Sequence, residues 1–308
     1  MIVTVTPNPS IDRTVEIDRL ERGALIRARR SSAEAAGKGL NVSCALAAQG
    51  IATVAVLPLA GETATSYLGL LADATPIAAV PIAGSIRINL SLIEADGTVT
   101  KVNEPGPALD AADVDALLFA AGGVPDTAWI LGCGSLPPGA PGDFYARLAA
   151  LGSPVRRVAV DASGEALSAA VSAGVALVKP NRAELEELVG CTLSTLGDVV
   201  AGAQTLIARG CDAVLVSLGA DGAVCVDADA ALHAEAPIND AINTVGAGDA
   251  LLAGFVAAGG GHAGLLTGIA WSVAAVRSPG TRMRPVTAAD RAAVTAHERL
   301  DPARRLQR

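Results

Sequence analysis

Aromatic residues are scarce in this chain of 308 residues: they make up 2% of it, whereas hydrophobic residues make up 51%. The core must therefore be built from alanine, valine, leucine and isoleucine. Such a composition favours alternating strands and helices over a β-sandwich. At this length we expect one large domain with an insertion, or two domains.

The chain also lacks a surplus of basic residues, because its formal net charge is −8. This argues against nucleic acid or an anionic membrane as a partner. A small phosphorylated ligand remains compatible with the charge, since it needs only a few local cations.

No two cysteines form a CxxC pair. The five are scattered along the chain at Cys44, Cys133, Cys191, Cys211 and Cys225. We expect them to be buried small apolar residues in a reducing cytoplasm. The first residues contain no charged region followed by a long apolar run, so a signal peptide is not expected and a cytoplasmic location is predicted.

Acidic residues, lysine and arginine are absent between Asp249 and Arg277, over a stretch long enough to suggest a membrane span. Three glycines at positions 259–261, followed by His262, divide this stretch into two short pieces. Two buried helices joined by a glycine turn are the better interpretation, and we expect no membrane as a partner.

Roughly eight strand-like runs alternate with helix-like runs, which is typical of a doubly wound sheet. In open α/β sheets, ligands bind beyond the carboxyl ends of the strands. Asp12 follows the first predicted strand, at residues 2–6, and is either a ligand for a hydroxyl group or an ordinary turn residue. The region from Pro285 onward is expected to form a surface helix followed by a frayed end.

The stretch NTVGAGDALLAG, residues 243–254, indicates a glycine loop running into a helix N-terminus. Unpaired amides at such a terminus attract anions, and Gly246, Ala247 and Gly248 would let an anion approach closely. Asp249 either caps this helix or accepts a proton from a hydroxyl group that attacks a phosphate held there.

A second glycine loop, AAGKGLN, places Lys38 between Gly37 and Gly39, before a helix predicted from about Leu40. Such a lysine suits a bound anion, although a solvated loop lysine is the alternative. This is not a Walker A loop, because Gly39 stands where serine or threonine is required.

The segment SIRINLSLIEADGTVTKVNEPG predicts a β-hairpin that turns at residues 96–97. Side chains alternate along a strand, so Arg87, Asn89 and Ser91 share one face. That face is either a solvated edge or a flap that presents its polar groups to a ligand. Farther along, Asn181 and Glu184 fit a helix-capping pair that follows a strand.

Eight segments of the chain resemble, in the same order, the motifs of the ribokinase-like (PfkB) carbohydrate kinases. They are TPNPSID, AAGKGLN, RIN, NEPGP, GSLPPG, VKPNRAELEELVG, VSLGADGA and NTVGAGD. The resemblance covers nearly the whole chain. It implies one kinase domain over residues 1–308, with a doubly wound, mostly parallel sheet flanked by helices. It also implies a small β-sheet lid, inserted at about residues 11–33 and 85–104, that often forms a homodimer interface.

The resemblance also implies roles for the loop residues. Asp249 matches the catalytic base, and Gly246, Ala247 and Gly248 match the anion hole. The substrate-binding positions are Asp12, Gly37, Lys38, Asn41, Arg87 and Arg27. The nucleotide-binding positions are Lys179, Asn181, Ser217, Gly219, Asp221, Gly222 and Gly248. Glu184, with Asn181, would order Mg²⁺ through water beside ATP.

The motifs TPNPSID and DGTVTKVNEPGP are most similar to those of bacterial 1-phosphofructokinases. We therefore expect phosphorylation of fructose 1-phosphate by ATP. Alternatives are a tagatose-6-phosphate or fructose-6-phosphate kinase, or a non-catalytic sugar-phosphate sensor on the same fold. The chain departs from the family pattern at Ala36, Ala250 and Asn243, which affects the expected substrate more than the expected reaction.

Overall fold

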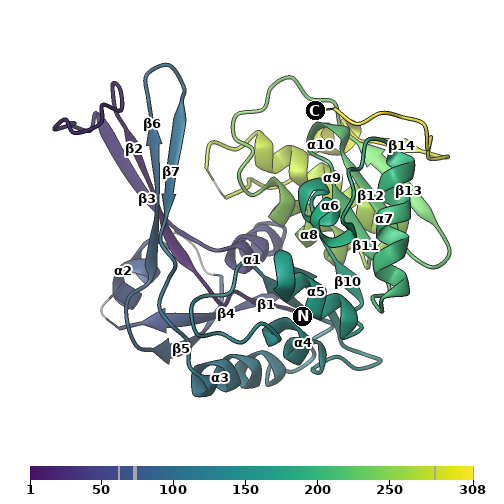
Figure 1. Cartoon of the computed structure of the whole chain (residues 1–308), viewed down its shortest axis with the longest axis horizontal. Coiled ribbons are helices and arrows are strands. Elements are labelled where there is room, and N and C mark those ends of the chain that lie inside the picture. The colour runs from purple at the N-terminus through teal and green to yellow at the C-terminus, as the bar shows by residue number, and fades with distance from the viewer. Residues whose placement is uncertain (62, 72–74, 281, 308) are drawn as a thin grey trace.

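The computed structural model describes residues 1–61, 63–71, 75–280 and 282–307, which form two β-sheets and the helices that cover the larger one (Figure 1). In the larger sheet seven neighbouring strands are parallel, namely β11 (Val214–Ser217), β10 (Leu177–Val178), β9 (Arg157–Asp161), β8 (Trp129–Cys133), β1 (Ile2–Val5), β4 (Thr53–Ala60) and β5 (Ile77–Ile82). Three antiparallel strands extend it beyond β11, namely β12 (Ala223–Val226), β13 (Ala231–Glu235) and β14 (Thr295–His297). The predicted doubly wound, mostly parallel sheet is confirmed.

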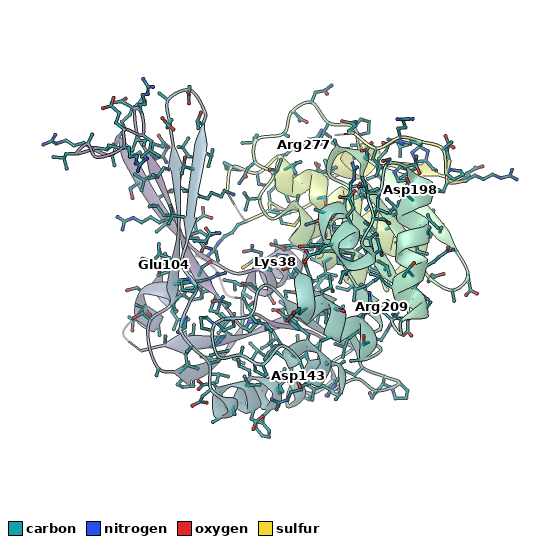
Figure 2. The ribbon with its side chains drawn as sticks, in the orientation of Figure 1. Lys38, Glu104, Asp143, Asp198, Arg209 and Arg277 are labelled. Atoms are coloured by element: carbon teal, nitrogen blue, oxygen red, sulfur yellow. The ribbon has the colours of Figure 1, made fainter. Side chains whose placement is uncertain are left out.

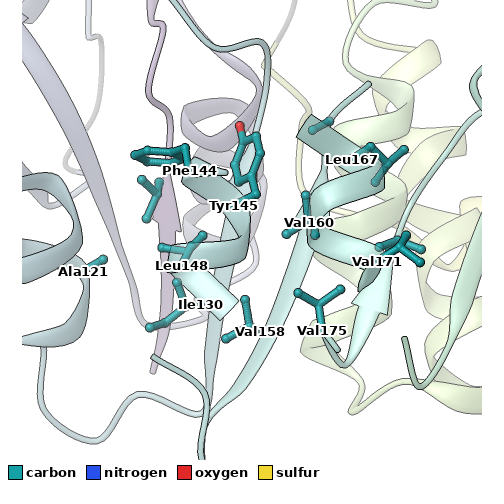
Figure 3. Close-up of a cluster of buried hydrophobic side chains, with 14 of the residues drawn as sticks. Ala121, Ile130, Phe144, Tyr145, Leu148, Val158, Val160, Leu167, Val171 and Val175 are labelled. Carbon is teal, nitrogen blue, oxygen red and sulfur yellow. The ribbon is translucent and has the colours of Figure 1, made fainter. Parts of the chain in front are cut away.

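Helices pack on both faces of this sheet, because side chains alternate along each buried strand. Val3 and Val5 of β1 join one hydrophobic cluster, and Ile2 joins the other. The first cluster contains α3 (Ala111–Gly122), α4 (Phe144–Ala149), α5 (Gly164–Ser172), α6 (Arg182–Val189) and α7 (Leu196–Ala208). Figure 3 shows part of it, where α4 lies over Ile130 and Val158. The second cluster contains α1 (Lys38–Ala48), α8 (Ala247–Ala257) and α9 (Gly261–Val276).

Helices α8 and α9 make an unusually close crossing. A Cβ added to Gly254 would lie 2.8 Å from the Cα of Gly268, and one added to Gly268 would lie 2.6 Å from the carbonyl oxygen of Leu251. These contacts fix α8 against its neighbour. The region without charged residues thus forms two helices joined at glycines, as predicted. None of the helices in the described part of the chain has both the length and the apolar character that a membrane crossing requires.

The smaller sheet stands away from the main body (Figure 1). Its strand order is β3 (Arg30–Ala36), β2 (Ser10–Glu16), β6 (Arg87–Ile93) and β7 (Val99–Asn103), and β2 and β6 are parallel. The predicted hairpin is confirmed, since β6 and β7 pair antiparallel. Helix α2 (Thr63–Gly69) follows β4.

Two expectations are wrong in part. The region after Pro285 forms a helix, α10 (Ala288–Ala292), as predicted, but its described residues then add β14 to the large sheet instead of fraying. Buried Asp290 binds Arg284 and Arg277, which anchors this region to the end of α9. Among the cysteines, Cys191 is exposed and Cys44 is half-buried, whereas the other three are buried as expected.

Candidate active site

Two adjoining cavities lie at the carboxyl ends of the parallel strands, as expected for an open α/β sheet. One has a volume of about 360 Å³ and is lined by polar groups from the small sheet, the lysine loop and α8. The other, of about 480 Å³, lies between the 217–222 loop, α8 and α9. Asn181, Ser217 and Gly248 line both cavities, so the cavities meet beside Asp249.

Asp249 is the third residue of α8, whose N-cap is Gly246 at φ 83°. Among the described residues, the hydrogen bond that its carboxylate accepts comes from Asn41 Nδ2, at 2.8 Å, and not from the amides that begin the helix. Only 8% of the residue is exposed, and this burial raises the pKa of Asp249 to about 6. Neighbouring Asp161 raises this pKa further, whereas the Asn41 hydrogen bond and two lysines lower it. Asp249 is therefore a carboxylate that binds a proton near neutral pH.

Asp161 ends β9 and is completely buried between two lysines. Its Oδ1 lies 2.9 Å from Lys38 Nζ, and its Oδ2 lies 3.0 Å from Lys179 Nζ. Burial alone would raise the pKa of Asp161, but Lys179 and Lys38 outweigh it, so the pKa falls below its ordinary value. The same pairing raises the pKa of Lys38 despite the burial that lowers it. Asp161 therefore stays ionised and holds both ammonium groups at the cavity. Figure 2 shows Lys38 between the small sheet and the main body.

The lysine loop needs glycine on both sides of Lys38. Gly37 has φ 145°, and a Cβ there would lie 2.7 Å from Thr6 Cγ2. A Cβ on Gly39 would lie 2.5 Å from Thr6 Oγ1, the atom that accepts a hydrogen bond from the Leu40 amide. Helix α1 consequently begins at Lys38, two residues earlier than predicted, and directs Asn41 toward Asp249.

One face of the small sheet contributes the rest of the polar cavity. Asn89 Nδ2 donates to both Ser10 Oγ and Asp12 Oδ1 at 3.0 Å, and Ser10 Oγ donates to Asp12 Oδ1 at 2.7 Å. Asn89 Oδ1 and Arg87 Nε are buried without a hydrogen-bond partner among the described residues. Buried polar atoms are normally paired, so these two atoms indicate a polar ligand between the sheet and the main body.

The larger cavity has a mostly apolar wall, which α8 and α9 supply through residues such as Leu251, Ile269 and Val273. Its polar lining residues are Ser217, Thr244, Ser272 and Asn181, of which Ser217 and Asn181 also line the polar cavity. Asn181 and Glu184 form the predicted capping box: Asn181 Oδ1 accepts from the Glu184 amide, and Glu184 Oε2 accepts from the Asn181 amide. An apolar wall with a few polar groups fits a base and its phosphate groups.

The donor set also fits Mg²⁺ bound chiefly by phosphates. Glu184 lines the polar cavity, and its Oε1 has no hydrogen bond among the described residues. The described residues contain no group of three or more histidine, cysteine, aspartate or glutamate side chains that could hold a metal. Mg²⁺ needs only one or two carboxylates when it shares waters and substrate phosphates, so this sparse set suffices.

Comparison with known proteins identifies the family. The pattern of the pfkB family carbohydrate kinases matches residues 5–260 of the chain. The chain belongs to this family. It is 41% identical over 270 residues to a 1-phosphofructokinase of Haloferax volcanii, covering 84% of each chain. It is 39% identical to a 1-phosphofructokinase of Xanthomonas campestris, covering 83% of each. The crystal structure of phosphofructokinase-2 from Escherichia coli in complex with fructose-6-phosphate superposes with a TM-score of 0.83 at 31% identity, covering 94% of this chain and 96% of that one.

Most of the predicted site residues of this pfkB kinase line the two cavities. Asp12, Gly37, Lys38, Asn41, Arg87, Lys179, Asn181, Glu184, Ser217, Gly246, Gly248 and Asp249 line the polar cavity. Gly219, Gly222 and Ala247 line the apolar one. Two predicted residues line neither: Arg27 is exposed in the connection between β2 and β3, and the carboxylate of Asp221 points to residues 304 and 307.

Two polar residues of the cavity, Ser10 and Asp161, were not predicted from the sequence. Asn89 also lines the cavity, on the strand face shared with Arg87 that was expected either as a solvated edge or as a flap facing a ligand. A signal existed for Asp161, because it ends a buried strand as Asp12 follows one. Nothing local in the sequence singles out Ser10.

The raised pKa of Asp249 predicts that Asp249→Asn stabilises the protein above pH 6. Between the ordinary pKa of 3.8 and about 6, the folded protein retains a proton that the unfolded chain has lost, so wild-type stability falls as pH rises. Asparagine carries no titrating proton, so the variant does not lose this part of the free energy of unfolding, which is on the order of 3 kcal/mol when complete. Denaturant unfolding from about pH 4 to pH 8 measures it.

The difference in unfolding free energy between Asp249→Asn and wild type should grow from about pH 4 to pH 6 and stay constant above pH 6. A variant no more stable than wild type at neutral pH would contradict the raised pKa of Asp249.

Proposed function

We propose that the protein transfers the γ-phosphoryl group of ATP to the C6 hydroxyl of fructose 1-phosphate, giving fructose 1,6-bisphosphate and ADP. The observation that carries this proposal is the position of Asp249. It lies where the two cavities meet, on the first turn of α8 and beside the two lysines that flank Asp161. A proton acceptor, an anion site and two separate binding spaces are what phosphoryl transfer to an alcohol requires.

In the proposed reaction, Asp249 accepts the proton of the attacking hydroxyl group. The hydroxyl oxygen forms a bond to the γ-phosphorus, and the bond between that phosphorus and the β–γ bridging oxygen breaks. The amides of Gly246 and Gly248 have no backbone hydrogen bond among the described residues, so they are available to the transferring group. Donors fixed in advance stabilise developing charge without reorganisation.

The sugar phosphate is proposed to bind in the polar cavity. Asp12 and Asn41 are positioned to bind hydroxyl groups, and Arg87 and Lys38 to bind the phosphate. The hydrogen bonds from Ser10 and Asn89 both reach Oδ1 of Asp12, so Oδ2 remains an acceptor. Lys179 is proposed to bind the transferring phosphoryl group, because its Nζ would lie 3.4 Å from a Cβ on Gly248, which lines both cavities. Glu184, with Asn181, would hold Mg²⁺ through water; bound there, the ion would neutralise charge on the phosphates.

Two sugars compete for this assignment. The Haloferax and Xanthomonas relatives, both named 1-phosphofructokinases, favour fructose 1-phosphate. The Escherichia coli structure holds fructose 6-phosphate on the same fold, so that sugar is the second candidate. Fructose 1-phosphate and fructose 6-phosphate differ only in the position of the phosphate, so the polar cavity must select between them by where it binds that group.

The small sheet is proposed to act as a lid and as a dimer interface. The face opposite the polar cavity presents Ile11, Val15, Ile88, Leu90 and Leu92, all only partly buried. Val102, paired with Leu90 across β6 and β7, is 55% exposed. An apolar sheet face of this kind marks an interaction surface, and a second copy of the same sheet offers a complementary one.

A coupled assay of ADP release tests the substrate proposal. We expect the highest kcat/KM with fructose 1-phosphate, against fructose 6-phosphate and tagatose 6-phosphate. Arg87→Ala should raise the KM for the preferred sugar phosphate, because a charged hydrogen bond contributes about 1.5–3 kcal/mol. Arg147→Ala is the matched control, since Arg147 pairs with Asp115 on the surface of the main body.

Preference for another of the three sugars would replace fructose 1-phosphate as the substrate. An unchanged KM in Arg87→Ala would remove Arg87 from the phosphate site.

Loss of the proposed base should be severe. Asp249→Asn is expected to lower kcat about 10²- to 10⁴-fold while the protein stays folded. In the wild type, kcat/KM should fall as pH is lowered through about 6, where Asp249 gains its proton. Asp113→Asn, at the same third position of helix α3, should leave kcat unchanged. Most of the activity surviving in Asp249→Asn would exclude Asp249 as the base.

The lid interface can be tested by charge insertion. Leu90→Glu should dissociate a dimer, because it places a carboxylate in an apolar interface. Light scattering coupled to size-exclusion chromatography measures the mass. Val155→Glu, at an apolar residue that is 83% exposed outside the small sheet, is the control. A wild-type monomer, or a Leu90→Glu variant of unchanged mass, would reject the interface.

A further inference from the structure

The 217–222 loop, which lines the apolar cavity, contains an acidic residue that faces away from that cavity. Asp221 is 3% exposed, and its carboxylate accepts a hydrogen bond from the Gln307 amide at 2.7 Å. Arg304 Nη2 lies 3.4 Å from its other oxygen. A buried carboxylate requires such partners, so the loop depends on residues far along the chain.

The loop also rests directly on β13. A Cβ on Gly222, which has φ 80°, would lie 2.1 Å from the carbonyl oxygen of Ala234. The carbonyl oxygen of Asp221 accepts a hydrogen bond from His233 Nε2 at 2.8 Å. The loop is therefore held between the apolar cavity on one side and β13 with residues 304–307 on the other.

Residues 301–307, here called the tail segment, are themselves firmly attached. The carbonyl oxygens of Pro302 and Arg304 accept hydrogen bonds from the amides of Gly197 and Leu196, both at 3.0 Å. Those amides belong to the first turn of α7, where a helix leaves its N–H groups unpaired, so the tail segment completes the helix. Gly197 permits the close approach, since a Cβ there would lie 2.8 Å from Pro302 O.

Arg304 connects the tail segment to the rest of this assembly. It donates two hydrogen bonds to Glu235 of β13, at 2.8 and 2.5 Å, in addition to its contact with Asp221. Such a two-pronged pair is rigid as well as strong. In Figure 1 the yellow end of the chain lies beside α6 and β13. The tail segment also lies outside residues 5–260, the part matched to the family.

We infer that the tail segment, through Arg304 and Asp221, positions the 217–222 loop for binding of the nucleotide. Arg304 is thus a positioning residue for the phosphoryl donor, and it acts without touching the sugar phosphate. This inference rests on the proposed function only in assigning the apolar cavity to the nucleotide.

Arg304→Gln tests the inference by steady-state kinetics. We expect the KM for ATP to rise roughly 2- to 30-fold, the range over which residues outside a binding site alter its affinity. The KM for the sugar phosphate and kcat should stay near their wild-type values, a split that general destabilisation would not produce. Arg209→Gln is the matched control: Arg209, like Arg304, contacts two residues, here Ser168 and Leu188, but at the opposite end of α7.

A double-mutant cycle with Asp221→Asn shows whether the two residues act together. If they do, the double variant should have about the same KM for ATP as Arg304→Gln alone. Effects that multiply, or an unchanged KM for ATP in Arg304→Gln, would overturn the inference. Should Arg304→Gln fail to fold, Glu235→Gln weakens the same arginine and should raise the KM for ATP in the same way.

Calorimetric titration with ADP, without sugar, separates this inference from the proposed function. Weaker ADP binding by Arg304→Gln supports the inference even if no sugar tested is phosphorylated. An active enzyme whose Arg304→Gln variant binds ADP as tightly as wild type retains the proposed function and refutes the inference.

Discussion

Two carboxylates and two lysines meet at one site, and the way they pair decides what each can do. Asp161 takes both lysines, whereas Asp249 is left with a single hydrogen bond from Asn41. Consequently the pKa of Asp161 falls, and the pKa of Asp249 rises to about 6. When the environments of two carboxylates shift their pKa values in opposite directions, one carboxylate keeps its charge and the other can accept a proton.

The fold produces this pairing by bringing four elements to one edge of the sheet. Asp161 ends β9, Lys179 follows β10, Lys38 begins α1 and Asp249 lies in the first turn of α8. The close contacts at Gly254 and Gly268 hold α8, and with it Asp249, in a fixed position against α9. Parallel strands with helices on both faces thus supply the site without any one loop holding all of it.

The sequence predicted what depends on local chemistry. Glycine loops, the hairpin, the capping pair and the doubly wound sheet each have a local signature, and each was found. Pairings across long separations have none: Lys38 and Asp161 are 123 residues apart, and Asn41 and Asp249 are 208 apart. For the same reason Asp221, which belongs to the predicted nucleotide-binding motif, gave no sign that its carboxylate binds residues 304 and 307.

The two cavities are built by different physical means. The polar one is preorganised by fixed hydrogen bonds among Ser10, Asp12 and Asn89, so its selectivity depends on polar geometry. The apolar one relies on packing, and its loop is supported from behind by the tail segment. Asp249 lies where the two cavities meet, and its burial raises its pKa to about 6, which lowers the stability of the fold at neutral pH. Groups that destabilise a fold in this way are common at functional sites.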